Sequence, residues 1–331
     1  MLYSDKLDSN RHNSNRHYTQ KLSCLLLLIV ALSLILLLAG SGLDVDYIIP
    51  KRFARLTAII IGSLCVALSS IIFQTLVNNR ILTPAIMGYE AVYLMWQALL
   101  LLTLGTHGLA MLGTGGNFFI SLALMLVYSW LLQRWLLGQA RPDLYRLLLI
   151  GLVLTMVIST FTQFVQLRID PGEFAVLQGL SYASFTRANT DTLLYSIIAV
   201  TLVCVIGYKY WPELDALTLG QAQATSLGVN TTQLMRLYLA LIAILVSVST
   251  SLIGPTAFLG IFVANITYAL SASRKHRLTL PMGCAIAMTL FLVAQLLVEH
   301  VFNYRTTVTI LINLVCGAYF LMLIVRTRGT L

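Results

Sequence analysis

Long hydrophobic runs separated by short polar stretches fill almost the whole chain after residue 21. Each run approaches the roughly 20 residues that an α-helix needs to cross the hydrocarbon core of a bilayer. The pattern therefore predicts an all-α integral membrane protein with about ten transmembrane helices. The expected spans are 22–40, 55–77, 86–104, 117–137, 146–166, 190–210, 234–252, 257–271, 281–298 and 307–325.

The two ends of the chain differ in character. Residues 1–21 are polar and basic, and we expect them to form a cytoplasmic N-terminal tail. The apolar run that follows is too long for a signal peptide, so no cleavage is expected. Because no Gly/Ser-rich or Pro-rich linker follows, residues 22–331 are expected to form a single transmembrane domain. The span 257–271 is short enough to be re-entrant in part, and 173–185 is expected to be a short surface helix.

An even number of spans places both termini on the same side of the membrane. With the N-terminus inside, fifteen of the 21 Lys and Arg residues fall on the cytoplasmic side and six fall outside. This excess is the positive-inside pattern of bacterial inner-membrane proteins. We therefore predict a multi-pass protein of the bacterial inner membrane with both termini in the cytoplasm.

Composition agrees with a membrane protein and excludes other classes. Hydrophobic residues make up 58% of the chain and charged residues 10%, against roughly 25% charged residues in soluble proteins. The net charge of +9 does not indicate nucleic-acid binding, because no basic patch is interleaved with aromatic residues. The five cysteines lie far apart in apolar runs, where they are expected to pack rather than to bind metal. They are Cys24, Cys65, Cys204, Cys284 and Cys316.

Chemistry-bearing residues are scarce inside the predicted spans. Glu90 and Glu299 are near predicted helix ends, so no buried acid or base is visible as an ion-coupling site. The sequence also has no HExxH, no GxSxG and no P-loop. We therefore expect no catalytic residue, metal or cofactor in this chain, and if the chain pumps a solute the energy must come from another subunit. A self-sufficient secondary transporter or channel is the alternative to such a pump.

One polar stretch interrupts the apolar pattern, with the sequence QTLVNNRILTPAIMG from Gln74 to Gly88. Pro84 cannot continue a helix, so it either ends the polar turn or restarts a helix, while Gly88 permits close backbone approach. Irregular backbone at membrane depth survives only against protein or a water-filled cavity. Gln74 and Asn79 can satisfy the freed backbone groups. A similar break at Gly254-Pro255 is expected on the opposite side of the membrane, and a plain connecting turn is the alternative for both.

Four blocks of the sequence resemble motifs of the FecCD-type ABC importer permeases, which take up iron–siderophore complexes and cobalamin. The residues in these blocks are most similar to those of the branch that imports ferric catecholate or related siderophores. The chain departs from the common family pattern at Gln221 and Ala222, where two Glu are usual, at Ala264 and Asn265, which replace Pro-His, and at Gln295, which replaces Asp. The blocks are RFARLTAIIIGSLCVALSSIIFQTLVNNRILTPAIMG, LTLGQAQATSLGVNTTQLMR, GPTAFLGIFVANITYAL and FNYRTTVTILINLVCGAYFLMLIVR.

The resemblance implies a type II ABC importer permease fold and a set of partners. It implies that the chain forms the translocation pathway with a second permease, which is expected to be a non-identical sibling. A cytoplasmic ABC ATPase dimer would drive transport, and a periplasmic or lipoprotein siderophore-binding protein would deliver the ferric siderophore. Membrane lipid surrounds the assembly, and nucleic acid is not an expected partner.

The resemblance also assigns roles to particular residues. The segment of about 213–233 is implied to couple to the ATPase, with Ala224 and Gly228 giving a smooth face and Leu227 an apolar anchor; an ordinary loop is the alternative. Exposed arginines are implied to dock the binding protein, with anchoring to lipid headgroups as the alternative. The residues are Gln221, Ala224, Leu227 and Gly228 for coupling, Arg52, Arg55 and Arg305 for docking, and Gln74, Asn79, Pro84, Gly88, Gly254, Pro255 and Asn265 for the pathway and helix breaks.

Overall fold

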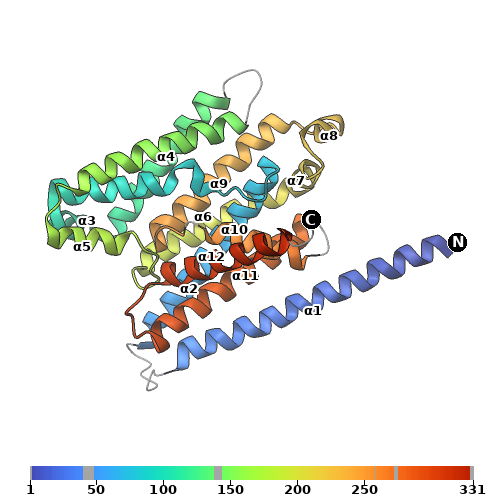
Figure 1. Cartoon of the computed structure of the whole chain (residues 1–331), viewed down its shortest axis with the longest axis horizontal. Coiled ribbons are helices and arrows are strands. Elements are labelled where there is room, and N and C mark those ends of the chain that lie inside the picture. Colours follow the sequence, from blue (N-terminus) through green and yellow to red (C-terminus); the bar gives the residue numbers. More distant parts are fainter. Residues whose placement is uncertain (1, 40–47, 138–143, 257, 272–274, 329–331) are drawn as a thin grey trace.

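The described part of the chain is helical and contains no strand (Figure 1). The computed structural model describes residues 2–39, 48–137, 144–256, 258–271 and 275–328. The helices are α1 (Leu2–Leu38), α2 (Ile48–Val77), η1 (Pro84–Met87), α3 (Tyr89–Leu137), α4 (Leu144–Gln166), α5 (Pro171–Leu180), α6 (Thr190–Lys209), α7 (Trp211–Leu217), α8 (Gln221–Ser226), α9 (Thr231–Ile253), α10 (Leu259–Leu270), α11 (His276–Leu296), η2 (Leu297–Val301) and α12 (Val308–Arg328).

Seven helices of the described residues are long and apolar enough to cross a membrane. One of them, α3, is broken by non-helical backbone at Gly105 and Gly113, so it provides two of the predicted spans. The shorter apolar helices α10 and α12 provide two more. With α3 counted twice, the helices coincide with the ten apolar segments expected from the sequence. The short surface helix expected at 173–185 is present as α5, which begins two residues earlier and ends at Leu180.

The core of the bundle is formed around α2 and α9, with α11 beside them. In the most apolar 18 residues of α2, 78% of the residues are buried, whereas in the most apolar 18 residues of α1 only 11% are buried. Small residues allow the other helices to approach α2 closely. At Gly62, for example, an added Cβ would lie 2.7 Å from the Ile253 side chain of α9. The outer helices α1, α3, α4 and α6 therefore present apolar faces to lipid or to another subunit.

Two ends of the bundle can be distinguished in Figure 1. The helices α7 and α8, the beginning of α1 and the end of α12 lie toward one end, and α5 lies with the break of α3 at the other. Since the beginning of α1 and the end of α12 share an end, the bundle has the even number of crossings that the sequence predicts. The helix α1 begins at Leu2, so residues 2–21 continue the first span as helix.

The short helix α10 does not have the length of a membrane span. Its 12 residues extend about 18 Å, against a hydrocarbon core of about 30 Å. It begins deep in the bundle, where a Cβ added at Gly260 would collide with the Ser70 side chain of α2. The chain that leads into α10 is therefore irregular at membrane depth, where it needs protein or water around its backbone.

Candidate functional site

The polar stretch after α2 folds into a compact turn held by its own side chains. Asn78 adopts a left-handed conformation with φ of 52°, which ends α2. The buried Gln74 donates from Nε2 to the carbonyl of Arg80 at 2.9 Å, and Asn79 Oδ1 accepts from the N–H of Ile81 at 2.9 Å. Both side chains thus satisfy backbone groups of the turn that follows the helix, the carbonyl of Arg80 and the N–H of Ile81. Pro84 restarts the chain as the first residue of the 3-10 helix η1.

Both the backbone conformation and the surrounding side chains require a glycine at position 88. Gly88 closes η1 in the left-handed region with φ of 89°, which favours glycine. An added Cβ would lie 2.7 Å from Tyr128 Oη of α3 and 2.8 Å from Thr155 Oγ1 of α4. The Tyr128 hydroxyl donates to the carbonyl of Met87 at 2.8 Å, and that of Thr155 lies 3.1 Å from the carbonyl of Ile86. The backbone of η1 is therefore held at membrane depth by two neighbouring helices.

The second break follows α9 and also depends on close backbone approach. Gly254 has φ of 99°, and an added Cβ would lie 3.0 Å from the carbonyl oxygen of Tyr182. The N–H of Ser184 donates to the carbonyl of Ile253 at 2.7 Å, and Pro255, which has no N–H, is buried. The N–H of Thr256 donates to the Glu90 carboxylate at 3.0 Å. Glu90 thus has a structural contact at the beginning of α3.

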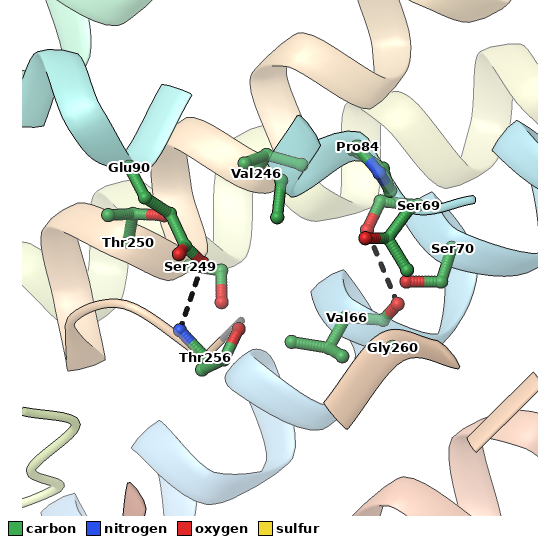
Figure 2. Close-up of a pocket in the computed structure, with 12 residues that line it drawn as sticks. Val66, Ser69, Ser70, Pro84, Glu90, Val246, Ser249, Thr250, Thr256 and Gly260 are labelled. Atoms are coloured by element: carbon green, nitrogen blue, oxygen red, sulfur yellow. Dashed lines mark hydrogen bonds between the residues drawn. The ribbon is translucent and has the colours of Figure 1, made fainter. Parts of the chain in front are cut away.

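The two breaks meet around one cavity, which the sequence did not predict. Figure 2 shows Glu90, Ser249 and Thr250 on one side of this cavity and Pro84, Ser69 and Ser70 on another. Its volume is about 30 Å³, enough for a water molecule. The Ser249 hydroxyl is buried without a hydrogen-bond partner among the described residues. The breaks enter the bundle from the two sides that the sequence predicts for them, and η1 and the beginning of α10 both border this cavity.

Asn265 connects α10 to the first break. Its Nδ2 lies 3.0 Å from the carbonyl of Ile261 and 3.4 Å from the carbonyl of Arg80, the group that Gln74 also contacts. The Arg80 guanidinium lies over the Tyr268 ring at 4.9 Å. The tertiary structure therefore brings Gln74 and Asn265, which are far apart in sequence, to the same carbonyl oxygen.

The predicted coupling segment forms two short helices, α7 and α8, at one end of the bundle. Glycines bracket α8: Gly220 has φ of 104° and Gly228 has φ of 86°. The N–H of Gly228 donates to Thr225 and that of Val229 to Ala224, which closes the helix with a left-handed residue. Gln221 is exposed, and its Nε2 lies 3.7 Å from the Met235 sulfur.

One expectation about this segment is wrong. Ala224 and Gly228 were expected to share a smooth outward face, but Ala224 is fully buried and packs inward, while Gly228 is exposed with open space around its Cα. The reason is that the chain leaves the helix at Leu227, so the four-residue helical spacing no longer applies. Leu227 is 66% exposed and remains suited to be an apolar anchor. It borders a groove of about 520 Å³ that Glu213, Asn230 and Gln233 also line.

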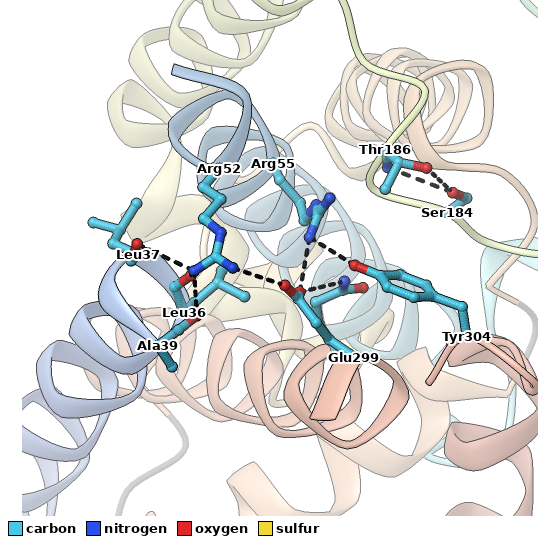
Figure 3. Close-up of polar contacts among 10 residues, drawn as sticks. Leu36, Leu37, Ala39, Arg52, Arg55, Ser184, Thr186, Glu299 and Tyr304 are labelled. Atoms are coloured by element: carbon cyan, nitrogen blue, oxygen red, sulfur yellow. Dashed lines mark hydrogen bonds and ion pairs between the residues drawn. The ribbon is translucent and has the colours of Figure 1, made fainter. Parts of the chain in front are cut away.

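The arginines expected to be exposed at the opposite end are paired within the chain, with the exception of Arg305. Figure 3 shows Arg52 and Arg55 converging on Glu299, at 3.4 Å and 2.8 Å. Their side chains are only 11% and 16% exposed. Arg52 also donates to carbonyl oxygens at the end of α1, including that of Ala39 at 2.6 Å, and Arg55 donates to Tyr304 Oη at 3.1 Å. This cluster joins α1, α2 and η2, while Arg305 itself is exposed.

A further polar cluster, which the sequence did not single out, joins α7, α11 and α2. His276 is buried, and its Nδ1 lies 2.6 Å from Asp215 Oδ1, which also accepts from the N–H of His276 at 2.8 Å. The Nε2 on the other side of the ring lies 2.9 Å from Thr75 Oγ1. Partial burial opposes the charged form of Asp215, but the hydrogen bonds from His276 outweigh it and lower the pKa of Asp215.

Sequence reasoning missed Asp215, His276, Tyr128 and Thr155, and it placed Glu299 only near a helix end. Each is a single polar residue in an unremarkable context, and its partner is more than 40 residues away in sequence in each contact described above. Pattern and spacing carry no information on such pairs. Within the described residues no group of three or more His, Cys, Asp or Glu side chains is arranged to hold a metal ion.

Broken helices that meet inside an apolar bundle, with two short helices at one end, define a multi-pass membrane permease. The comparisons with known proteins specify which kind. The chain belongs to the FecCD transport family, whose model matches residues 31–326. This is a family of ABC importer permeases, as the four sequence blocks indicated.

Several relatives are permeases of siderophore importers. The petrobactin import system permease protein YclO of Bacillus subtilis (strain 168) is 35% identical over 281 residues, which cover 85% of this chain and 89% of that protein. FatC of Bacillus anthracis, named as a permease of a petrobactin import system, is 30% identical over 98% of this chain and 96% of its own length. A second permease of a petrobactin system in that organism, FatD, is 24% identical over 96% of this chain.

The fold is also that of a solved ABC transporter chain. A structure described as the inward-facing conformation of a metal-chelate type ABC transporter matches with a TM-score of 0.81. The match covers 93% of this chain and 99% of the solved one, at 21% identity. The type II ABC importer permease fold expected from the sequence is therefore confirmed. The pairing of FatC with FatD in one organism is in keeping with a second permease as the partner of this chain.

Proposed function

We propose that this chain is a transmembrane permease subunit of an ATP-driven importer of ferric siderophores, forming the translocation pathway with a second, non-identical permease. The observation that supports this most strongly is the family match over almost the whole chain, with two petrobactin permeases at 30% identity or more. A ferric siderophore of the catecholate or a related class is the cargo that we infer. Petrobactin is the first compound to test.

The chain has the parts of a passive gate rather than of a motor. It has no P-loop, so we infer that a cytoplasmic ATPase dimer binds and hydrolyses ATP with Mg²⁺ and that this chain binds no cofactor itself. The coupling segment supports this, because Leu227 is exposed beside a groove at one end of the bundle. Movement of the ATPases against this end would shift α7 and α8 as rigid bodies.

We infer that a periplasmic or lipoprotein binding protein docks at the opposite end, where Arg305 is exposed. Arg52 and Arg55 can contribute only through exchange of partners, because Glu299 already occupies them. Reversing both charges would bring three acidic side chains together and would disturb the fold. Arg305→Glu is therefore the variant that tests docking, and we expect weaker capture of the binding protein with an unchanged melting temperature.

We further infer that the protein lies in the bacterial inner membrane with both termini in the cytoplasm, with residues 1–21 as the cytoplasmic tail. The excess of Lys and Arg in the inside loops supports this orientation. It places α7, α8 and the polar turn after α2 on the cytoplasmic side. Gly254 and Glu299 then belong to the outer half.

The rival hypothesis, a self-sufficient secondary transporter or channel, differs in its energy source and partners. The decisive experiment reconstitutes the chain in proteoliposomes alone and together with the second permease, the ATPase and the binding protein. We expect uptake of ⁵⁵Fe-petrobactin only in the full assembly, and its loss when the ATPase carries an inactive Walker A lysine. Uptake by this chain alone, driven by a proton or sodium gradient, would reject the proposal.

The cargo is tested separately in cells. A strain that lacks the gene for this chain should lose growth on ferric petrobactin as its iron source, while growth on ferric hydroxamate siderophores continues. If the deletion strain grows normally on ferric petrobactin but not on another siderophore, the cargo is that other siderophore. The assignment of the chain to a siderophore importer would then still hold.

A further inference from the structure

The hydrogen-bonded chain Asp215–His276–Thr75 connects the coupling segment to the first helix break. Asp215 lies on α7, His276 is the first residue of α11, and Thr75 lies in the last turn of α2, next to Gln74. These three elements come together at the end of the bundle that carries α7 and α8 (Figure 1). These hydrogen bonds thus connect the surface that is proposed to bind the ATPase with the polar turn after α2.

The contacts at the first step are stronger than ordinary neutral hydrogen bonds. The Asp215 carboxylate accepts from both the backbone N–H and the ring Nδ1–H of His276, at 2.8 and 2.6 Å. A carboxylate is favoured at a helix N-terminus by the helix dipole and by the free N–H groups there. Charge-assisted hydrogen bonds of this kind are roughly twice as strong as neutral ones. Displacement of α7 therefore moves the beginning of α11 with it.

The second step holds the end of α2. His276 Nε2 lies 2.9 Å from Thr75 Oγ1, which in turn lies 3.0 Å from the carbonyl of Ile71 one turn earlier. The side chain of His276 is 2% exposed, so its ring is largely shielded from bulk water. Thr75 has one hydroxyl proton for two acceptors, so the hydrogen bonding of His276 determines whether the last turn of α2 keeps its additional bond to Ile71.

The cluster lies beside open space. A cavity of about 330 Å³ is lined by Thr75, His276, Thr218, Thr279 and Tyr268. The helices α7 and α2 make few direct contacts with each other, whereas α2 packs extensively against α11. The polar link therefore joins α7 to α2 across the beginning of α11, and the cavity leaves room for α7 to move.

We propose that Asp215, His276 and Thr75 are positioning residues that transmit the movement of the coupling segment to the end of α2 and so to the first helix break. This inference rests on the proposed function, because it assumes that an ATPase moves α7 and α8. It assigns a mechanical role to three residues to which the sequence motifs gave no role of their own.

The test uses the complete importer in nanodiscs and spin labels at two exposed positions, on a background without the five native cysteines. A label at Leu219→Cys, between α7 and α8 and 58% exposed, reports the coupling segment, and a label at Ile81→Cys, a site 72% exposed, reports the polar turn. With the link intact we expect ATP with vanadate to change the spectra at both positions. In Thr75→Val we expect the change at Ile81 to fall at least fivefold, while the change at Leu219 is retained.

Two controls separate transmission from simple destabilisation. Thr75→Ser restores the hydroxyl and should restore the response at Ile81. Thr279→Val removes a hydroxyl that lines the same cavity and, among the described residues, donates to the carbonyl of Lys275 just before its own helix, so it should leave the response unchanged. Asp215→Ala breaks the other end of the hydrogen-bonded link and should reduce the response at Ile81 as much as Thr75→Val does. The double variant should reduce that response no further than either single variant.

The outcomes distinguish the link from the function on which it rests. If ATP changes the spectrum at Ile81 as fully in Thr75→Val as in the parent, the link is wrong although the importer works. A loss at Ile81 that Thr279→Val reproduces also overturns the link. If ATP with vanadate never alters the label at Leu219 in an intact assembly, the coupling assignment fails, and the link fails with it.

Discussion

Single residues with left-handed backbone or paired charge determine the local shape at the helix breaks and at the outer end. Gly88 and Gly254 are needed because φ is positive and because neighbouring atoms lie within 3.0 Å of an added Cβ. Glu299 is needed because two guanidinium groups converge on it. These requirements are independent of one another, so each can be tested alone.

Gly88→Ala should destabilise the protein by about 2–4 kcal/mol, since the left-handed conformation costs an L-residue about 1–2 kcal/mol and overpacking adds a similar amount. Thermal unfolding of the purified chain in detergent measures the loss. Gly115→Ala is the matched control: it lies in α3 without positive φ and with open space around it, so it should be neutral or slightly stabilising. Equal melting temperatures for the two variants would contradict the geometry of η1.

Glu299→Gln should cost about 2 kcal/mol, because the amide keeps the shape but leaves Arg52 and Arg55 without a negative partner in a mostly buried position. We expect the melting temperature to fall and the contact between α1 and α2 to loosen, seen as faster hydrogen exchange near residues 36–39. Arg305→Gln, on the exposed loop, should change stability by no more than about 0.5 kcal/mol. An unchanged melting temperature for Glu299→Gln would show that the cluster contributes little.

Among the elements, α8 is the one whose exposed surface has the clearest proposed partner. Leu227 follows α8 and is exposed, so Leu227→Asp should leave the stability of the isolated chain within about 0.5 kcal/mol of the parent. Its affinity for the ATPase should fall at least tenfold, because a buried carboxylate would replace an apolar anchor at the docking surface. Co-purification and titration with the ATPase measure this loss.

Leu167→Asp provides the matched control for that prediction. Leu167 is 84% exposed and lies between α4 and α5, at the end of the bundle opposite α8 (Figure 1). It should bind the ATPase as the parent does. If Leu227→Asp binds equally well, the segment of about 213–233 is an ordinary loop. Gly228→Trp is less informative, because its φ of 86° adds backbone strain to any change at the docking surface.

For the whole molecule, the arrangement of ten helical segments predicts which loops face which compartment. Single cysteines at Ile81 and Leu227 should react with a membrane-impermeant maleimide only in inverted vesicles, because both positions are exposed at the end proposed to be cytoplasmic. Cysteines at Leu167 and Tyr304, also exposed, should react in intact spheroplasts. Labelling of Ile81 and Leu167 from the same side would contradict the topology.

Much of the molecule could be predicted from the sequence because its strongest signals are local. Apolar runs of span length predicted the helices, and Pro84 with Gly88 predicted the first break. Gln74 and Asn79 were predicted to satisfy backbone groups because their partners lie within six residues. The weakest prediction was the outward face of Ala224 and Gly228, since helical spacing was applied across a point where the helix ends.

The sequence by itself determined that the chain is an all-helical membrane permease of the FecCD family, since hydrophobicity, helix breakers and four ordered blocks are all local properties. Only the tertiary structure decided which distant groups meet. It brought the two breaks to one cavity, turned Arg52 and Arg55 from exposed cations into partners of Glu299, and linked Asp215 through His276 to Thr75. The physical reason is that a polar side chain inside a membrane protein must find a partner, and the packing of the helices selects that partner irrespective of its distance along the chain.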